Sequence, residues 1–380
     1  MNLSLTPEQE KLQKEAREFL TKECPWTLVK TTDDSESGFS KKLWKKIAAR
    51  GWLGFPLPQK YGGGGASLTD TAVLYEEMGQ VLLPGPYFSS TMLGGQIILA
   101  GGTEEQKAEL LPAVAKGEKI LALAFTEPDY GWGAECIHLS ASPNNGGFVL
   151  NGKKRFVHDA QIADQIICVA CTKETANPGE GITLFLVDMK SRGISCRDLP
   201  GFVGEKQNEL TFDSVKVPFS NIIGDTNRGW AILNAAFTKA IPVLCAFMVG
   251  GCQHVFEMTV DYSRTRMAFG QNIGFFQWVQ TYVINQTNDL ESARWTMYEA
   301  MSKIDAEKPE NEQAIAVSLA KAVASDAYYE VCSNAHEVHA GRGIQLEFPL
   351  YLYTKKARTL YTYLGDPSHH RGRLARLMGM

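Results

Sequence analysis

The stretch YSRTRMAFGQNIGFFQWVQ, from Tyr262 to Gln280, separates two long helical patterns in this chain of 380 residues. On both sides of it, apolar residues recur three and four positions apart, as they do on the buried face of a helix. The helical patterns of this part of the chain are centred on 229–265, 272–305, 311–337 and 350–363. They predict a bundle of four antiparallel helices, with a kink at Pro242 inside the first helix.

Upstream of this bundle, between about 121 and 225, the pattern changes from helical to extended. The segments LALAFT, GFVLNGKKRFV, DQIICVAC, ITLFLVDM and NELTFDSVKV are short, rich in β-branched and aromatic residues, and separated by turn residues. The pair Asn151-Gly152 in the second segment is typical of a two-residue hairpin turn. The sequence therefore predicts a small antiparallel β domain.

The first part of the chain again has a helical pattern. Thr6 can cap the first helix, Pro7 suits its first turn, and Gln9 completes a capping box. The glycine run 62–65 has no Lys-Ser or Lys-Thr pair after it, which favours a flexible turn over a phosphate-binding loop. The fold class predicted for the whole chain is α+β, with an N-terminal helical domain (1–120), a middle antiparallel β domain (121–225) and a C-terminal four-helix bundle (226–380).

Composition and charge exclude several classes of protein. With 44% hydrophobic and 21% charged residues, the chain has the composition of soluble globular proteins. A net charge of -4 does not supply the basic face that a nucleic-acid partner requires. No stretch approaches the roughly 20 apolar residues of a membrane span, and the N-terminus lacks the apolar core of a signal peptide. We therefore expect a cytoplasmic protein with no nucleic-acid or membrane partner.

The cysteines give no sign of a disulfide scaffold, because eight in 380 residues are too few and too irregularly spaced. Cys168 and Cys171 have the spacing of a metal-binding pair, but no second pair follows at the spacing of a zinc ribbon. Both lie in an extended segment, where residues three apart point to opposite faces. Buried free thiols are the favoured interpretation, and no metal site is predicted.

Two motifs of the predicted β domain resemble those of the acyl-CoA dehydrogenase family. Thr126-Glu127-Pro128 resembles the family's Thr-Glu-Pro, in which the threonine hydroxyl and nearby amides bond the pyrimidine edge of the flavin. The segment 151–157 resembles the strand whose aromatic residue, here Phe156, packs against the isoalloxazine. The resemblance implies FAD as cofactor, with flavin contacts from Phe125, Thr126, Phe156 and His158.

Two motifs of the helical part extend the resemblance over nearly the whole chain. The stretch 262–280 resembles the family's Arg-x-x-Phe-Gly…Phe-Gln signature, and HEVHAGRGIQLEFPL (336–350) resembles its Gln-x-x-Gly-Gly-x-Gly turn. Arginine offers a permanently charged fork to a diphosphate, and glycines let the backbone come close. The residues implied at the FAD pyrophosphate and adenine are Arg266, Phe269, Phe276, Gln277, Glu337 and Gly341. Because the first four would serve the neighbouring subunit's FAD, we expect a homotetramer or a heteromer with a related subunit.

The family's catalytic glutamate is missing from both positions that the resemblance indicates. Most members carry it in the turn after the last long helix, where this chain has Leu364. Others carry it on the first helix of the bundle, where an alignment on Pro242 places Ala240 and Ile241. Leucine, alanine and isoleucine cannot accept a proton.

Two other side chains could supply acid–base chemistry. His158 stands where a threonine usually bonds flavin N5, and its imidazole titrates near neutral pH; a packed histidine bonded to backbone is the alternative. Asp366 lies two residues past the usual base, and a purely local turn role is its alternative. His369 and His370 are expected to cap a helix or to contact a neighbouring subunit's nucleotide.

Other positions around the flavin also differ from the family pattern. Trp132 replaces a serine, and Glu337 and Ala340 replace the glutamine and first glycine of the diphosphate turn, where Arg342 could neutralise Glu337. Aromatic side chains would surround the acyl channel, which favours a ring-bearing or bulky acyl group unless some of them fill the core. The implied substrate-binding residues are Tyr130, Trp132, Phe237, Tyr363 and Leu364, with Phe247 beside them.

Three functions are compatible with this pattern. The first is an FAD-dependent acyl-CoA dehydrogenase that introduces an α,β double bond into a bulky, cyclic or dicarboxylic acyl-CoA and passes electrons to an electron-transfer flavoprotein. The second is a non-catalytic subunit of a heteromeric acyl-CoA dehydrogenase. The third is a flavin-independent lyase or hydratase acting on a CoA thioester, since a fold does not determine a function.

Overall fold

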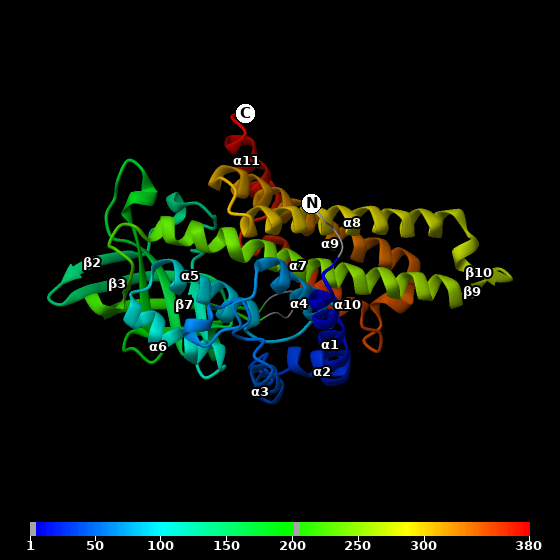
Figure 1. Cartoon of the computed structure of the whole chain (residues 1–380), viewed down its shortest axis with the longest axis horizontal. Helices are drawn as coiled ribbons and strands as arrows, with labels where there is room; N and C mark the ends of the chain where they lie inside the picture. The colour runs from blue at the N-terminus through cyan, green and yellow to red at the C-terminus, as the bar shows by residue number, and fades with distance from the viewer. Residues whose placement is uncertain (1–4, 201–205) are drawn as a thin grey trace. The chain divides into compact units, whose positions relative to one another are not determined.

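The computed structural model describes residues 5–200 and 206–380 (Figure 1). Contacts within the chain divide it into two units. The first, here called the helical unit, comprises residues 5–31, 67–83 and 241–380. The second, the sheet unit, comprises 32–66 and 84–240 with the same gap at 201–205. Along the chain, helices are followed by strands and then by helices again, which confirms the predicted fold class.

The N-terminal helix of the helical unit, α1 (Pro7–Glu23), begins as the sequence predicts. The Thr6 hydroxyl accepts a hydrogen bond from the Gln9 backbone N–H, and the Gln9 side chain accepts one from the Thr6 N–H. This reciprocal pair satisfies two of the N–H groups that a helix start leaves open. Ala16 and Leu20 make the buried stripe of α1. The helices α2 (Trp26–Asp33) and α4 (Leu68–Gln80) follow in the chain, and most of α2 and all of α4 belong to this unit.

The C-terminal part of the helical unit contains the four predicted helices and a fifth. They are α7 (Gly229–Thr265), α8 (Gln277–Asp305), α9 (Glu310–His339), α10 (Leu350–Thr362) and α11 (Pro367–Leu377). A hairpin of β9 (Met267–Ala268) and β10 (Gln271–Asn272) joins α7 to α8, and α7 continues through Pro242 as one helix. In Figure 1 this hairpin lies at the end of the helical unit remote from α11.

The helix α7 corrects the expectation that no stretch is apolar enough to span a membrane. By length and composition, α7 could do so. However, 67% of its most apolar 18-residue stretch is buried inside the protein, and the core helix of a soluble protein meets the same criterion.

Among its described residues, the sheet unit holds an eight-stranded sheet and three α-helices, besides the first turns of α7. The helices are α3 (Lys41–Ala49), α5 (Gly95–Gly101) and α6 (Glu104–Ala115). The strands are β1 (Leu121–Ala124), β2 (Ser140–Asn144), β3 (Gly147–His158), β4 (Gln165–Cys171), β5 (Ile182–Asp188), β6 (Ile194–Asp198), β7 (Gln207–Pro218) and β8 (Ile222–Ile223). Their order is β6-β7-β3-β2-β4-β5-β8, and β1 pairs with β4.

Two details of the predicted β domain are wrong. The sheet is mixed rather than antiparallel, because β1 runs parallel to β4 along four residue pairs and β2 meets β4 in a parallel bridge. The hairpin turn is Asn145-Gly146, between the paired residues Asn144 and Gly147, with Gly146 at φ +86°. The pair Asn151-Gly152 lies inside β3, where it shifts the register with β7.

The cysteines of β4 are both free, as predicted, but only Cys168 is fully buried. Cys168 is buried in the apolar core of the sheet unit, Cys171 is half-buried, and both are free. Burial raises the pKa of the Cys168 thiol to about 12, so it stays protonated at neutral pH. Among residues 5–200 and 206–380, no group of three or more His, Cys, Asp or Glu side chains is placed to hold a metal ion.

The helices α4 and α7 of the helical unit approach each other at glycine. A Cβ on Gly79 of α4 would lie 2.0 Å from the Phe247 carbonyl oxygen, and a Cβ on Gly250 of α7 would lie 1.9 Å from that of Glu76. No side chain fits between backbones at these distances, so both glycines are required by the packing.

We expect Gly250→Ala to lower the free energy of unfolding by about 1–3 kcal/mol, because the added methyl group forces α4 and α7 apart. Chemical denaturation of the purified variant measures the change. Gly372→Ala on α11 is the control, since its Cβ would meet no atom closer than 3.8 Å. Equal stability of the Gly250→Ala variant and the unaltered protein would contradict the packing argument.

Candidate functional site

A buried ion pair organises the loop that follows β1. Lys154 Nζ on β3 lies 2.7 Å from Glu127 Oε1 and donates to the Phe125 carbonyl at 2.9 Å. The exposed fractions of the Lys154 and Glu127 side chains are 0% and 6%. Burial lowers the pKa of Lys154, whereas the Glu127 carboxylate raises it. The carboxylate also accepts hydrogen bonds from the backbone N–H groups of His138 and Leu139, each at 2.9 Å.

Thr126 lies between Phe125 and Glu127, the two residues of the loop that bond to Lys154. Its carbonyl accepts a hydrogen bond from the Arg155 N–H at 2.8 Å, which ties the loop to β3. Within residues 5–200 and 206–380, the Thr126 hydroxyl has no hydrogen-bond partner, and the residue is only half-buried. The loop therefore presents a fixed hydroxyl that a ligand can bind.

Beside this loop the structure brings together Tyr130, Trp132 and Phe156. The Phe156 ring packs edge-to-face against Tyr130 at 5.8 Å, and Tyr130 packs against Trp132 at 4.9 Å. Phe156 has φ +55° at a bulge of β3, and its ring remains 40% exposed. A left-handed backbone is uncommon for an aromatic residue, and such conformations concentrate at functional sites. The bulge presents the Phe156 ring as an accessible flat surface.

Phe125 belongs to a second aromatic group. It is buried, stacks at 6.2 Å on Trp230 and meets Phe237 edge-on at 5.8 Å. Trp230 and Phe237 lie in the first turns of α7 within the sheet unit. Trp230 was not predicted from the sequence, because its contact with Phe125 depends on where α7 begins. Phe237 is predicted to bind substrate, and in this unit it is a buried packing partner of Phe125.

His158 ends β3 and is half-buried. Its Nε2 lies 3.0 Å from Gln207 Nε2 on β7, so a side-chain amide helps to hold the ring. His158 and Phe156 are two residues apart on the same strand. This placement suits both predictions made for His158, a base beside a flavin and a packed histidine, and it tests neither.

The predicted nucleotide-binding residues of the helical unit gather at the hairpin end. Phe269 at the hairpin is 96% exposed and packs edge-to-face against Phe276 at 6.1 Å. The side chains of Arg266 and Gln277 are exposed. The end of α9 reaches the same region, because the ring of His339 stacks on that of Tyr262 at 4.5 Å.

Glu337 lies near the end of α9 and Gly341 lies two residues beyond it, and both are exposed. The expectation that Arg342 neutralises Glu337 is wrong, because no ion pair joins them in the part of the chain that the structure describes. Instead, the Arg342 guanidinium lies 4.9 Å from the ring centre of Phe348. A cation over an aromatic face is attracted by the ring quadrupole, which holds Arg342 here.

The turn between α10 and α11 contains Leu364 and is held from beneath by Lys321. Lys321 is fully buried, and its Nζ donates to the carbonyls of Leu360 and Gly365 at 3.2 and 2.9 Å and to the Ser325 hydroxyl at 2.7 Å. Burial lowers the pKa of Lys321 to about 8, which leaves the ammonium form predominant at neutral pH. Sequence analysis missed this lysine.

His370 holds the same turn from α11. It is buried, and its Nε2 lies 3.0 Å from the Leu364 carbonyl. Burial, with a further contribution from the Lys321 charge, lowers the pKa of His370 to about 3. At neutral pH the imidazole is therefore uncharged and can donate its Nε2–H to that carbonyl.

Asp366 caps α11: its Oδ1 accepts a hydrogen bond from the His369 N–H at 2.7 Å. This local role accounts for the aspartate, while its catalytic role stays a prediction. The Leu364 side chain is buried and its backbone has φ +59°. The half-buried Tyr363 completes the turn, whose side chains before Asp366 carry no carboxylate.

Comparison with known proteins is consistent with this arrangement. Residues 6–118, 122–215 and 227–379 match the models named "Acyl-CoA dehydrogenase, N-terminal domain", "middle domain" and "C-terminal domain". A "3-(aryl)acrylate reductase" of Clostridium sporogenes is 30% identical over 366 residues, which are 95% of each chain. "Caffeyl-CoA reductase-Etf complex subunit CarC" of Acetobacterium woodii is 30% identical over 367 residues, which are 94% of this chain and 95% of that protein.

Solved structures give the same picture. The chain "FAD complex of PigA" superposes with a TM-score of 0.90 at 26% identity, covering 100% of this chain and 99% of that chain. A variant of the "Tcur3481-Tcur3483 steroid ACAD" superposes with a TM-score of 0.87 at 27% identity and covers 98% of both chains.

We expect Lys154→Met to lower the free energy of unfolding by about 3–5 kcal/mol, because it leaves the Glu127 carboxylate buried without its counter-charge. The matched control is Lys153→Met on the same strand. That lysine is 51% exposed and lies 3.7 Å from Glu209, so its loss should change stability by about 1 kcal/mol or less. Thermal and chemical denaturation of both variants measure the difference, and similar losses in the two would contradict a structural role for the buried pair.

Proposed function

We propose a function on the premise that this chain belongs to the acyl-CoA dehydrogenase family, as its domain matches along residues 6–379 show. The proposal is a flavin-dependent oxidoreductase that acts on the Cα–Cβ bond of a CoA thioester with a ring-bearing or otherwise bulky acyl group. The observation that carries it is the aromatic group Tyr130–Trp132–Phe156 beside the anchored Thr126 loop.

The residues of this loop fit FAD. When bound, FAD would supply the hydride acceptor. Phe156 offers an exposed ring against which a flat heterocycle can pack, and the half-buried Thr126 hydroxyl can bond its polar edge. In the helical unit, the exposed guanidinium of Arg266 offers a charge for a diphosphate, in keeping with an oligomer whose subunits complete one another's sites. The FAD complex among the similar structures supports the same assignment.

The bulky acyl group is inferred from Trp132 and its neighbours. Tyr130 is 45% exposed and Trp132 is half-buried, so their rings are accessible on one side. Rings prefer edge-to-face or offset contacts with other rings, which favours an aryl or polycyclic acyl chain over a straight one. The aryl and caffeyl names of two relatives and the steroid name of one similar structure support this choice.

His158 is the proposed base, because the turn at Leu364 supplies no carboxylate and its histidine, His370, is buried and neutral. The His158 imidazole would take the proton from the substrate α-carbon. This role requires Nδ1 to carry the lone pair, and therefore Nε2–H to donate to the Gln207 side-chain amide in its other orientation. An electron-transfer flavoprotein is the proposed electron partner, in line with the name of the caffeyl-CoA relative.

A non-catalytic role in a heteromer is the second candidate, and one observation favours it. The turn at Leu364 keeps an ordered backbone but has only a buried apolar side chain at the position that the resemblance assigns to the base. Such a chain could complete a partner subunit's FAD site with its exposed hairpin while doing no chemistry.

The absorption spectrum of the untreated purified protein tests the proposal first. We expect flavin bands that bleach on anaerobic addition of 3-phenylpropionyl-CoA and respond less to butyryl-CoA. A flavin-loaded protein inert to every acyl-CoA until a related chain is added would favour the non-catalytic subunit. A protein that lacks flavin and converts a CoA thioester without an electron acceptor would overturn the proposal in favour of a lyase or hydratase.

We expect Trp132→Ala to reduce kcat/KM for the aryl substrate about twofold to tenfold relative to butyryl-CoA, since a ring–ring contact contributes about 0.5–1.5 kcal/mol. The exposed Phe219→Ala in the same unit is the control and should leave the ratio unchanged. A ratio that stays constant in the Trp132→Ala variant would remove Trp132 from the acyl site.

We expect His158→Ala to slow flavin bleaching by about 10²–10⁴-fold, the usual contribution of a general base. Asp366→Asn is the matched comparison, because asparagine keeps the cap on α11 and removes only the charge. Stopped-flow absorbance measures both rates. If Asp366→Asn is slow and His158→Ala is not, the base is Asp366 and our assignment is wrong.

A further inference from the structure

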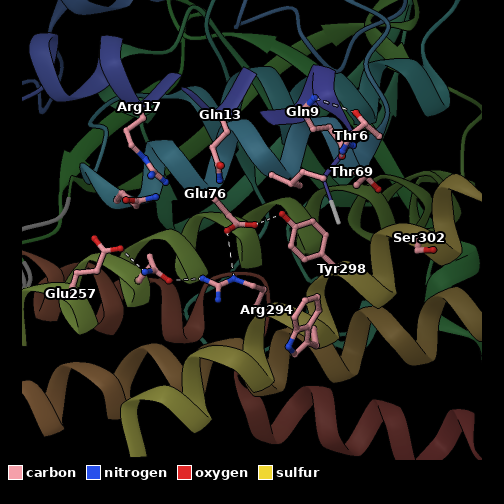
Figure 2. Close-up of a pocket in the computed structure, with 14 residues that line it drawn as sticks. Thr6, Gln9, Gln13, Arg17, Thr69, Glu76, Glu257, Arg294, Tyr298 and Ser302 are labelled. Atoms are coloured by element: carbon pink, nitrogen blue, oxygen red, sulfur yellow. Dashed lines mark hydrogen bonds and ion pairs between the residues drawn. The ribbon is translucent and has the colours of Figure 1, made fainter. Parts of the chain in front are cut away.

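A polar cavity of about 540 Å³ opens among four helices of the helical unit, and its wall includes none of the predicted flavin and acyl residues (Figure 2). Helices α1, α4, α7 and α8 all contribute to its wall. The wall carries several side-chain amides, from Gln9, Gln13, Gln80 and Gln253. A cavity of a few hundred cubic ångströms with converging polar groups is large enough for a small organic molecule.

One wall of the cavity is formed by Glu76 of α4, which is only 8% exposed. Its Oε1 accepts a hydrogen bond from the Tyr298 hydroxyl at 2.6 Å, and its Oε2 lies 3.9 Å from Arg294 Nε (Figure 2). The second distance is too long for a hydrogen bond. The Oε2 atom of this buried carboxylate is therefore only loosely compensated.

The arginines of the cavity are engaged by other groups. Arg17 donates to both carboxylate oxygens of Glu77, at 3.0 and 2.7 Å. Arg294 donates to Glu291 through Nη1 and to the Gln253 amide oxygen through Nη2, the latter at 2.7 Å. Among the described residues, two guanidinium groups thus stand beside four carboxylates, and these six groups together carry a negative charge. The carboxylates are those of Glu76, Glu77, Glu257 and Glu291.

We propose that this cavity binds a small organic cation with a primary ammonium group, such as an aliphatic diamine. The Glu76 carboxylate provides the counter-charge. The Gln13 amide points into the cavity in Figure 2, and in the described ranges 5–200 and 206–380 its side chain has no hydrogen-bond partner. Trp295, which is 40% exposed and lines the cavity, offers an aromatic face to a cation. The site does not depend on the function proposed above.

Such a site has a pH dependence whose sign follows from Glu76. Burial raises the pKa of Glu76 to about 7; Tyr298 and Arg294 on α8 lower it, and Glu77 and Glu291 raise it further. Arg17 on α1 and Glu257 on α7 are the other charged groups of the wall. Above pH 7 the Glu76 carboxylate is charged and attracts a cation, whereas below pH 7 it is protonated and neutral. Affinity should therefore rise about tenfold from pH 6 to pH 8, in proportion to the ionised fraction.

Isothermal titration calorimetry of the full-length protein with putrescine tests the proposal. At pH 8 we expect saturable binding of one molecule per chain, about tenfold weaker at pH 6. Butane-1,4-diol, which has the same length without charge, should not bind. Saturable binding of the diol with the affinity of putrescine, or no binding of putrescine, cadaverine or spermidine, would overturn the proposal.

Two variants place the binding site. Glu76→Gln keeps the shape and the acceptor for Tyr298, and should abolish both putrescine binding and its pH dependence. Gln13→Leu leaves the buried network intact and should weaken binding at least about tenfold by removing a charge-assisted hydrogen bond. Glu312→Gln, on an exposed face of α9, is the charge-matched control and should bind as the unaltered protein does. Unchanged binding in folded Glu76→Gln, or in Gln13→Leu should Glu76→Gln not fold, would place the cation elsewhere and overturn the proposal.

Discussion

The buried pair Lys154–Glu127 anchors the loop and the strand that carry three candidate flavin contacts, Phe125, Thr126 and Phe156. An ammonium and a carboxylate removed from water cost several kcal/mol each unless their hydrogen bonds are replaced. Here they are replaced by each other, by the Phe125 carbonyl and by two backbone N–H groups. The pair thereby joins the loop after β1, the strand β3 and the segment before β2. Thr126 directly precedes Glu127 and Phe156 lies two residues beyond Lys154, so both belong to backbone that the pair anchors.

Features of the fold that arise from a local pattern could be predicted from the sequence, whereas features that depend on long-range pairing could not. Long helices such as α9, predicted at 311–337 and found at Glu310–His339, follow from a local apolar repeat that one stretch of chain contains. The hairpin was misplaced because Asn145-Gly146 and Asn151-Gly152 offer the same turn chemistry. Pairing of β3 with β7, about 60 residues along the chain, decides between them, and no local pattern carries that information.

Some residues of the candidate site could be predicted from a local pattern, and others could not because their roles depend on long-range contacts. Strand alternation already places Lys154 on the inward face with Phe148 and Leu150, so its burial was a detectable signal. Trp230, Lys321 and His370 gave no such signal. Their roles come from contacts with residues far away in the chain, as when Lys321 caps the end of α10 about 40 residues later. Residues whose roles depend on tertiary contacts produce no periodic pattern in the sequence.

In the turn at Leu364, the backbone conformation and the chemistry of the side chain depend on different residues. A leucine with φ +59° is strained by roughly 1–3 kcal/mol, and Lys321 and His370 hold this backbone by hydrogen bonds to the carbonyls of Gly365 and Leu364. A substitution at position 364 can therefore change the chemistry of the turn while its backbone stays in place. Because Lys321 and His370 are buried and polar, they would be costly to retain without such a role. Their presence argues that the backbone conformation of this turn contributes to the protein independently of any base on it.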